Sequence, residues 1–146
     1  MPARNAALRC RSESVLAAMR PSRTGATIPR VAPSVLIVDD HADFRASARA
    51  LLERHGFEVV ADAKDGEEAL DAAARLRPDL VLLDVQLPGM DGFEVAERLA
   101  GFPRAPRVVL VSSRRRSAYE SRLPTAAVAG FLDKDELSGA ALAALL

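Results

Sequence analysis

The 146-residue chain has one cysteine, no tryptophan and only 4% aromatic residues. The single cysteine, Cys10, cannot form a disulfide framework or a cysteine metal cluster within one chain. No apolar run reaches the roughly 18 residues that a membrane-spanning helix needs, and the N-terminus lacks the apolar core of a secretory signal. We therefore expect a cytoplasmic protein that does not enter a membrane and whose core is built from aliphatic side chains.

Basic and acidic side chains balance over the whole chain but are unevenly distributed. Residues 1–32 carry six arginines and one glutamate, so the remaining residues are mildly acidic, which argues against direct binding of nucleic acid. The composition predicts that residues 1–33 form an arginine-rich disordered tail, with an organelle transit peptide or a translation start at Met19 as alternatives. Residues 34–146 suffice for one domain, and we expect no output domain beside it.

From residue 34 onward, short apolar runs alternate with segments that have helical patterns. The predicted strands are 34–38, 58–62, 80–83, 107–111 and 127–132, and the predicted helices are 42–55, 65–76, 91–100, 116–123 and a last one from 135 to the terminus. Strands that alternate with helices predict an α/β fold, a doubly wound five-stranded parallel sheet with helices on both faces.

Chemically distinctive residues follow several of the predicted strands. Asp39 and Asp40 end the first strand, Asp84 the third, Ser112 the fourth and Lys134 the fifth. Because ligands of open α/β sheets bind beyond the carboxyl ends of the strands, these side chains should share one crevice. Three neighbouring carboxylates repel one another and favour a divalent cation such as Mg²⁺, whose shell a phosphate oxygen can complete. The pattern therefore predicts a Mg²⁺-assisted phosphoryl site.

A carboxylate can itself accept a phosphoryl group, and Asp84 is the best candidate because it stands alone. The adjacent Asp39 and Asp40 are better placed to hold the metal. From the residues alone, a hydrolase with an aspartate nucleophile fits the same set of side chains.

Together these residues make the chain resemble the receiver domain of bacterial two-component response regulators, over residues 34–146. The resemblance rests on four motifs in order: Val38-Asp39-Asp40-His41, Leu83-Asp84-Val85-Gln86-Leu87-Pro88-Gly89-Met90-Asp91-Gly92, Val111-Ser112-Ser113 and Gly130-Phe131-Leu132-Asp133-Lys134. It implies a flavodoxin-like strand order 2-1-3-4-5. The motifs are most similar to those of receivers that usually precede a helix-turn-helix output domain.

The resemblance also implies roles for individual residues at the acidic site. Asp84 would be the phosphoacceptor, and Mg²⁺ would be held by Asp39, Asp40, Asp84 and the backbone carbonyl of Gln86. Lys134 would pair with a phosphoryl oxygen.

Four further positions are implied to act on the response or on the lifetime of the phosphate. Ser112 and Phe131 occupy the switch positions, although Phe131 cannot make the hydrogen bond that a tyrosine could make there. Gln86 and Arg114 occupy positions that tune the lifetime of the phosphoryl group.

The partners implied are a sensor histidine kinase or phosphotransfer protein and a downstream protein that binds the switch face. That face would be formed by helix 116–123, strand 127–132 and the last helix, and receivers can also form homodimers through it on phosphorylation. We expect a stand-alone phosphorelay protein and not an enzyme that acts on a separate metabolite. The alternatives are a truncated DNA-binding transcription regulator and a phosphate-independent interaction module.

Overall fold

The computed structural model describes residues 32–123 and 128–145, which form a five-stranded parallel sheet covered by helices. The strands are β2 (Ser34–Val38), β3 (Glu58–Ala63), β4 (Leu80–Asp84), β5 (Arg107–Ser112) and β6 (Gly130–Asp133). The helices are α1 (Ala42–Arg54), α2 (Gly66–Leu76), α3 (Gly92–Ala100) and α4 (Gly139–Ala143), with 3₁₀ helices η1 (Arg116–Tyr119) and η3 (Lys134–Glu136). The strand order β3-β2-β4-β5-β6 confirms the predicted order 2-1-3-4-5.

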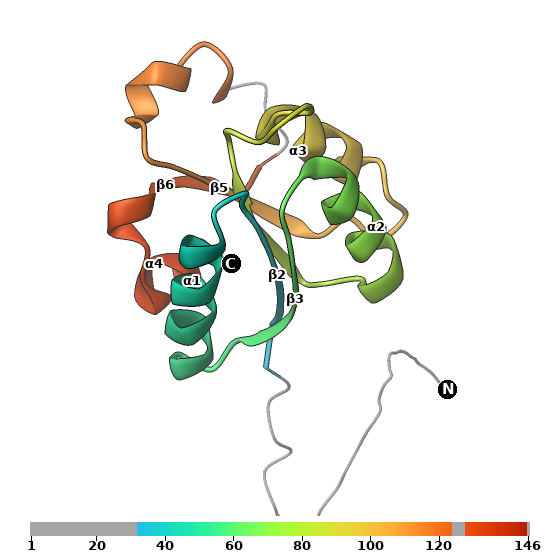
Figure 1. Ribbon diagram of the computed structural model, residues 1–146, viewed down its shortest axis with the longest axis vertical. Coiled ribbons are helices and arrows are strands. Elements are labelled where there is room, and N and C mark those ends of the chain that lie inside the picture. The colour runs from blue at the N-terminus through green and yellow to red at the C-terminus, as the bar shows by residue number, and fades with distance from the viewer. Residues whose placement is uncertain (1–31, 124–127, 146) are drawn as a thin grey trace, which may run out of the picture. The chain divides into compact units, whose positions relative to one another are not determined.

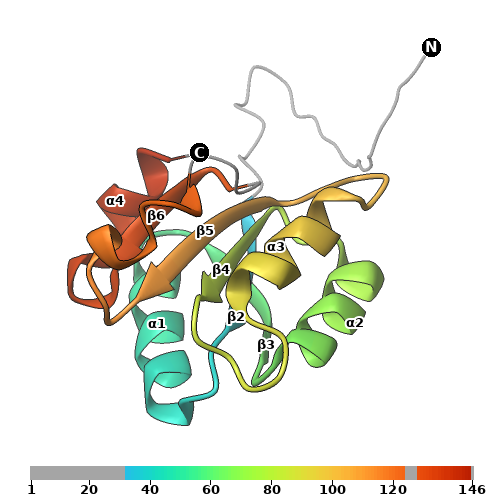
Figure 2. The same cartoon turned by 90° about the horizontal axis from the view of Figure 1, so that it is seen from above.

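The helices lie on both faces of the sheet, as predicted. Helices α1 and α4 cover one face and α2 and α3 cover the other (Figures 1 and 2). Alternate strand residues face opposite sides: Leu80 and Leu82 of β4 pack in the cluster with α1 and α4, whereas Val81 and Leu83 pack in the cluster with α2 and α3. All four are fully buried, and each such side chain stabilises the fold by about 1.5–3 kcal/mol.

Local signals set the ends of the helices. The Asp65 side chain caps α2 by accepting a hydrogen bond from the Glu68 N–H at 2.9 Å, and the Asp91 side chain caps α3 by accepting one from the Glu94 N–H at 3.0 Å. After α1, Gly56 has a φ of 88°, a left-handed conformation that glycine adopts without the steric cost that other residues have. These caps fix where the loops at the carboxyl edge of the sheet begin and end.

The predicted helix 116–123 is wrong, because the segment forms the 3₁₀ helix η1 followed by turns. Its backbone hydrogen bonds join residues three apart, such as Ala118 N–H to Arg115 O and Arg122 N–H to Tyr119 O, both at 2.9 Å. Only Tyr119 in this segment is buried among the residues whose burial is described, so little packing stabilises a longer α-helix.

The last strand and helix also begin later than predicted. Strand β6 starts at Gly130, whereas the predicted start at residue 127 lies outside the described residues. The last α-helix starts at Gly139, not at residue 135, because the Ser138 side chain caps it by accepting a hydrogen bond from Ala141 N–H at 3.0 Å. Nearly all of the predicted tail 1–33 lies outside the described residues. In the part of the chain that the structure describes, none of the helices has the length and apolarity to cross a membrane.

Candidate functional site

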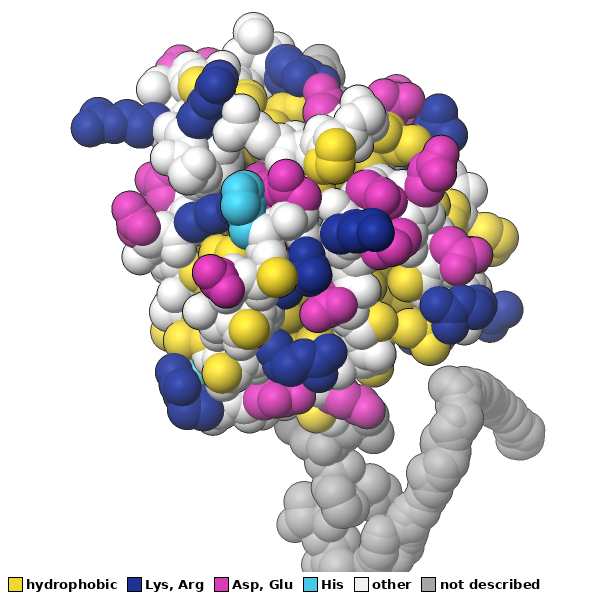
Figure 3. All heavy atoms as spheres, in the orientation of Figure 1, with side chains coloured by type: hydrophobic (Ala, Val, Ile, Leu, Met, Phe, Trp, Pro, Cys, Tyr) yellow, Lys and Arg dark blue, Asp and Glu magenta, His cyan; other side chains and the backbone are white. Residues whose placement is uncertain are grey.

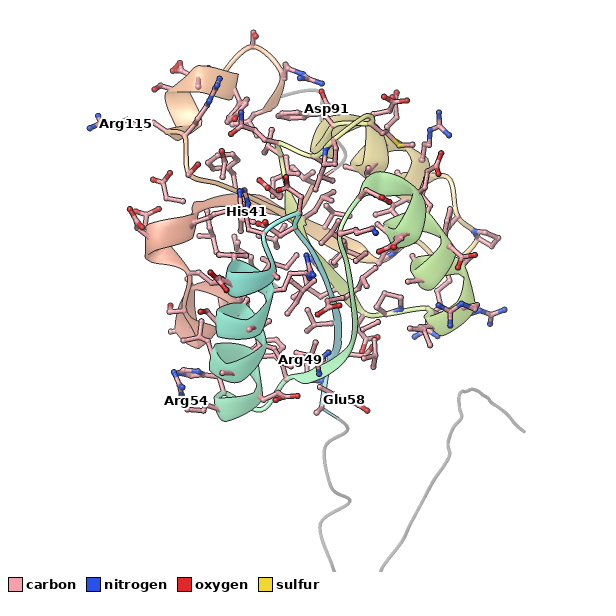
Figure 4. All side chains as sticks on the ribbon, viewed as in Figure 1. His41, Arg49, Arg54, Glu58, Asp91 and Arg115 are labelled. Atoms are coloured by element: carbon pink, nitrogen blue, oxygen red, sulfur yellow. The ribbon has the colours of Figure 1, made fainter. Side chains whose placement is uncertain are left out.

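The three predicted carboxylates converge at the carboxyl edge of the sheet, where the adjacent strands β2 and β4 end. Asp39 has no exposed surface and Asp84 is 2% exposed, whereas Asp40 is exposed. Ligand atoms of these residues and of His41 all lie within 4.8 Å of one another. His41 precedes α1 at this edge (Figure 4). The predicted grouping of Asp39, Asp40 and Asp84 is therefore present.

Lys134, the first residue after β6, reaches into this acidic cluster. Its Nζ atom lies 2.6 Å from Asp39 Oδ2 and 3.5 Å from Asp84 Oδ2, and its side chain is 15% exposed. The same ammonium lies 4.5 Å from the centre of the Phe44 ring. The contact with Asp39 is an ion pair without the geometry of a hydrogen bond, so Asp39 Oδ2 is buried with no hydrogen-bond donor.

The pKa of Asp84 is raised from 3.8 to about 6, first because the carboxyl is buried and second because the charge of Asp39 is close. Lys134 opposes this effect, as does the Gln86 N–H, which donates a hydrogen bond to Asp84 Oδ1 at 3.2 Å. At neutral pH Asp84 is thus mainly a carboxylate, although burial and the Asp39 charge make its ionised form less favourable than that of an exposed aspartate. An ionised carboxylate in a buried, positively flanked position can act as a nucleophile.

Asp39 is held by contacts that the sequence did not reveal. The His41 N–H donates to Asp39 Oδ1 at 2.8 Å, and the His41 ring Nδ1 lies 3.0 Å from the same oxygen. Arg45, one turn into α1, donates from Nη1 to the Asp39 backbone carbonyl at 2.7 Å. Arg45 is an unremarkable residue in the sequence, and no spacing rule would have connected it to the end of β2.

The donor set fits a hard divalent cation. Three carboxylates face one another at one end of the sheet, and two of them are buried beside a single lysine, so an added positive charge would relieve their repulsion. Mg²⁺ binds through few carboxylates and keeps several waters, which suits a site open to solvent at Asp40. The backbone carbonyl of Gln86 stays a prediction as a further ligand.

Ser112 ends β5 beside these residues, since Asp84 of β4 pairs in register with Val111. Ser112 has no exposed surface, and its Oγ accepts a hydrogen bond from the Arg114 N–H at 3.0 Å. The same Oγ lies 3.2 Å from the hydroxyl of Tyr119, a residue that sequence analysis did not single out. Phe131, in β6, is 8% exposed and packs against the Tyr119 ring.

A parallel sheet in this order, with paired acids, a further aspartate and a lysine at its carboxyl edge, defines an α/β domain with an acidic cluster that is compatible with a metal ion. The chain belongs to the response regulator receiver domain family, whose sequence model matches residues 35–145. Receiver domains bind Mg²⁺ at their acidic pocket, and the cluster of Asp39, Asp40, His41 and Asp84 could hold a metal ion here.

Individual relatives agree with this assignment. The chain is 38% identical over 113 residues to the response regulator GacA of Pseudomonas viridiflava, a match that covers 77% of this chain and 51% of that protein. It is 46% identical over 95 residues to protein-glutamate methylesterase/protein-glutamine glutaminase 5 of Myxococcus xanthus, covering 64% of this chain and 26% of that protein. The signal receiver domain of NarL from Mycobacterium tuberculosis has a TM-score of 0.72 and 32% identity, covering 80% of this chain and 98% of that one.

The chain spans about half the length of several curated relatives that it matches, which carry the names of transcriptional regulators. The shared half is the receiver domain, so the similarity concerns the receiver and not the remainder of those proteins.

Proposed function

We propose that this chain is a phosphoacceptor receiver in a two-component phosphorelay, with Asp84 as the residue that is phosphorylated. The observation that carries the proposal is the position of Asp84, which is buried at the end of β4 beside Lys134 and the pair Asp39 and Asp40. The donor would be a phosphohistidine of a sensor kinase or a phosphotransfer protein.

In the proposed reaction, an Asp84 oxygen attacks phosphorus while the bond from phosphorus to the donor imidazole nitrogen breaks. The phosphoryl group moves to Asp84, and the imidazole leaves with the electron pair of the broken bond and takes up a proton. Bound Mg²⁺, held by Asp39, Asp40, Asp84 and the Gln86 carbonyl, would neutralise charge on the phosphoryl oxygens. Lys134 would pair with a phosphoryl oxygen, and Ser112 would donate a hydrogen bond to another.

The response would pass to the face around η1, β6 and the C-terminal helices through Ser112 and Phe131. A phosphoryl group changes the local charge, and that change biases a two-state surface. We propose that a downstream protein, or a second phosphorylated copy, binds this face. Figure 3 shows basic and acidic side chains interspersed on the side of the domain that it draws, without the continuous basic patch that nucleic-acid binding favours.

In this proposal the receiver signals through protein contacts and catalyses nothing beyond its own phosphorylation and dephosphorylation. The half-length match to transcriptional regulators favours a second candidate, in which the domain is the receiver half of a DNA-binding regulator. The nucleotide sequence downstream of the Leu146 codon distinguishes the two candidates. A helix-turn-helix encoded in frame supports the DNA-binding regulator, and a stop codon supports the receiver that signals through protein contacts alone.

The test of the phosphoacceptor is intact mass after incubation with acetyl phosphate, with and without Mg²⁺. We expect a Mg²⁺-dependent gain of one phosphoryl group in the wild type, no gain in Asp84→Asn, and a normal gain in Asp71→Asn. Asp71 is a suitable control because its exposed carboxylate pairs only with Arg75 on the surface of α2, among the contacts described. A folded wild type that gains no phosphoryl group contradicts the proposal and favours a phosphate-independent interaction module.

A further inference from the structure

Tyr119 is the single tyrosine of the chain, and its hydroxyl contacts the site. The residue is 8% exposed, and its Oη lies 3.2 Å from Oγ of the fully buried Ser112. It lies on η1, the segment where a regular helix was predicted. The link between Tyr119 and Ser112 therefore depends on the 3₁₀ geometry of that segment.

The Tyr119 ring is held on two sides. Its centre lies 5.7 Å from that of Phe93 at the start of α3 and 5.8 Å from that of Phe131 in β6. The Arg122 guanidinium, one turn further along, stacks over Phe93 at 4.0 Å and pairs with Asp91 at 3.1 Å. These contacts position the phenol independently of its hydroxyl, so removing the oxygen alone should leave the ring in place.

The hydrogen-bonding capacity of Ser112 decides what the contact does. A serine hydroxyl has one hydrogen to donate and two lone pairs that accept. One lone pair takes the Arg114 N–H at 3.0 Å. The buried Tyr119 hydrogen also needs an acceptor, and Ser112 Oγ is the one that the described residues offer. With Tyr119 as donor, both lone pairs are filled and the hydrogen of Ser112 is left to be donated elsewhere.

We propose that Tyr119 is a positioning residue, which fills one lone pair of Ser112 Oγ and thereby directs the Ser112 hydrogen toward the phosphoryl group on Asp84. This inference rests on the proposed function, because it assigns Ser112 as a donor to that group. Tyr119 also provides a hydroxyl next to the switch serine, Ser112, whereas Phe131 at the other switch position has no hydroxyl. Tyr119 acts through Ser112 and does not itself touch the reacting atoms.

The first experiment compares phosphorylation rates with acetyl phosphate and Mg²⁺, measured by intact mass on the full chain. Tyr119→Phe keeps the ring and should slow phosphorylation about three- to tenfold, the loss expected for one orienting hydrogen bond. In a Ser112→Ala background the same substitution should cause no further loss. Ser113→Ala, which removes an exposed neighbouring hydroxyl, should match the wild type.

A second readout uses the absence of tryptophan, which leaves Tyr119 as the dominant source of near-ultraviolet absorption and fluorescence. Ser112→Ala should shift the tyrosine spectrum of the unphosphorylated protein, because it removes the hydrogen-bond acceptor. Asp84→Asn should leave that spectrum unchanged. Thermal unfolding of each variant verifies that it is folded.

A wild-type phosphorylation rate in Tyr119→Phe would overturn the inference. The same holds if Tyr119→Phe slows phosphorylation equally in the Ser112→Ala background, or if the tyrosine spectrum does not change in Ser112→Ala. Failure of the proposed function looks different. In that case the wild type itself gains no phosphoryl group, and both proposals fail together.

Discussion

The Lys134 ammonium lies 2.6 Å from Oδ2 of Asp39, a carboxylate with no exposed surface. The two residues come from the ends of β6 and β2, strands at opposite sides of β4 and β5 in the sheet. Their ion pair holds a positive charge beside Asp84 before any cation or phosphate arrives. The pocket is thus organised by the fold, since a buried charge needs a partner.

Replacing Lys134 by methionine should leave the buried carboxylates of Asp39 and Asp84 without the ammonium group that pairs with both of them. We expect the free energy of unfolding without Mg²⁺ to fall by about 2–4 kcal/mol, because breaking a buried pair leaves a charge uncompensated. Saturating Mg²⁺ should restore part of this loss. Urea denaturation with EDTA and with Mg²⁺ measures both quantities.

The matched control is Lys64→Met, which removes the other lysine of the chain. Lys64 is exposed and lies 3.9 Å from Glu68, so its loss should change stability by less than about 0.5 kcal/mol. An equal loss of unfolding free energy in Lys134→Met and Lys64→Met would show that the ion pair of Lys134 with Asp39 does not behave as a buried one.

Asp84→Asn should stabilise the metal-free protein, and the gain should depend on pH. The folded-state pKa of Asp84 is raised to about 6, so the folded protein holds this proton more tightly than the unfolded chain. Wild-type stability should therefore fall as pH rises from about 4 to about 6 and level off above that. At pH 8 in EDTA, we expect the variant to be more stable by about 1–3 kcal/mol.

Urea titrations at pH 4.5 and pH 8 measure the difference in unfolding free energy between Asp84→Asn and the wild type. This difference should be smaller at pH 4.5. A gain that is the same at both values would mean that burial of charge at Asp84 is not its cause.

Gly92→Ala should disturb the site through the backbone. An added Cβ would meet the carbonyl oxygen of Asp84 and lie 2.8 Å from Val85 Cα, while the Gly92 N–H donates to Val85 O at 2.8 Å. We expect a loss of about 1–3 kcal/mol in unfolding free energy, because α3 must move away from β4. Phosphorylation by acetyl phosphate should slow as Asp84 shifts.

Gly101→Ala is the control for this change, since its Cβ would lie 3.4 Å from the Arg98 carbonyl with a negative φ of −83°. Thermal unfolding compares the pair. A Gly92→Ala protein as stable as Gly101→Ala would show that α3 can move without cost.

Arg114→Ala should shorten the lifetime of the phosphoryl group. The Arg114 N–H bonds Ser112 Oγ, and its exposed guanidinium follows the site by two residues, where it can shield or bond a phosphoryl oxygen. Loss of one charge-assisted contact predicts a half-life about two- to fivefold shorter, followed by intact mass after removal of acetyl phosphate.

Arg115→Ala serves as the control, because Arg115 points away from the domain (Figure 4). It should leave the half-life unchanged. If Arg114→Ala behaves in the same way, Arg114 has no part in protecting the phosphate.

The sequence alone was enough to predict the sheet and the carboxylates at its edge. Buried parallel strands are apolar runs, and the acids and the lysine that follow them must meet once the strands align. The cap of α2 at Asp65 and the turn at Gly56 are likewise local features, since both depend on residues a few positions apart.

Only the tertiary structure decided the contacts between distant or locally ambiguous segments. Helical spacing in residues 116–123 favoured an α-helix, yet Tyr119 packs between Phe93 and Phe131 and the segment is a 3₁₀ helix with turns. The bond from Arg45 to the Asp39 carbonyl and the contact of Tyr119 with Ser112 have no sequence signature. They exist because packing sets how helices and loops lie on the sheet, and packing is a property of the whole core.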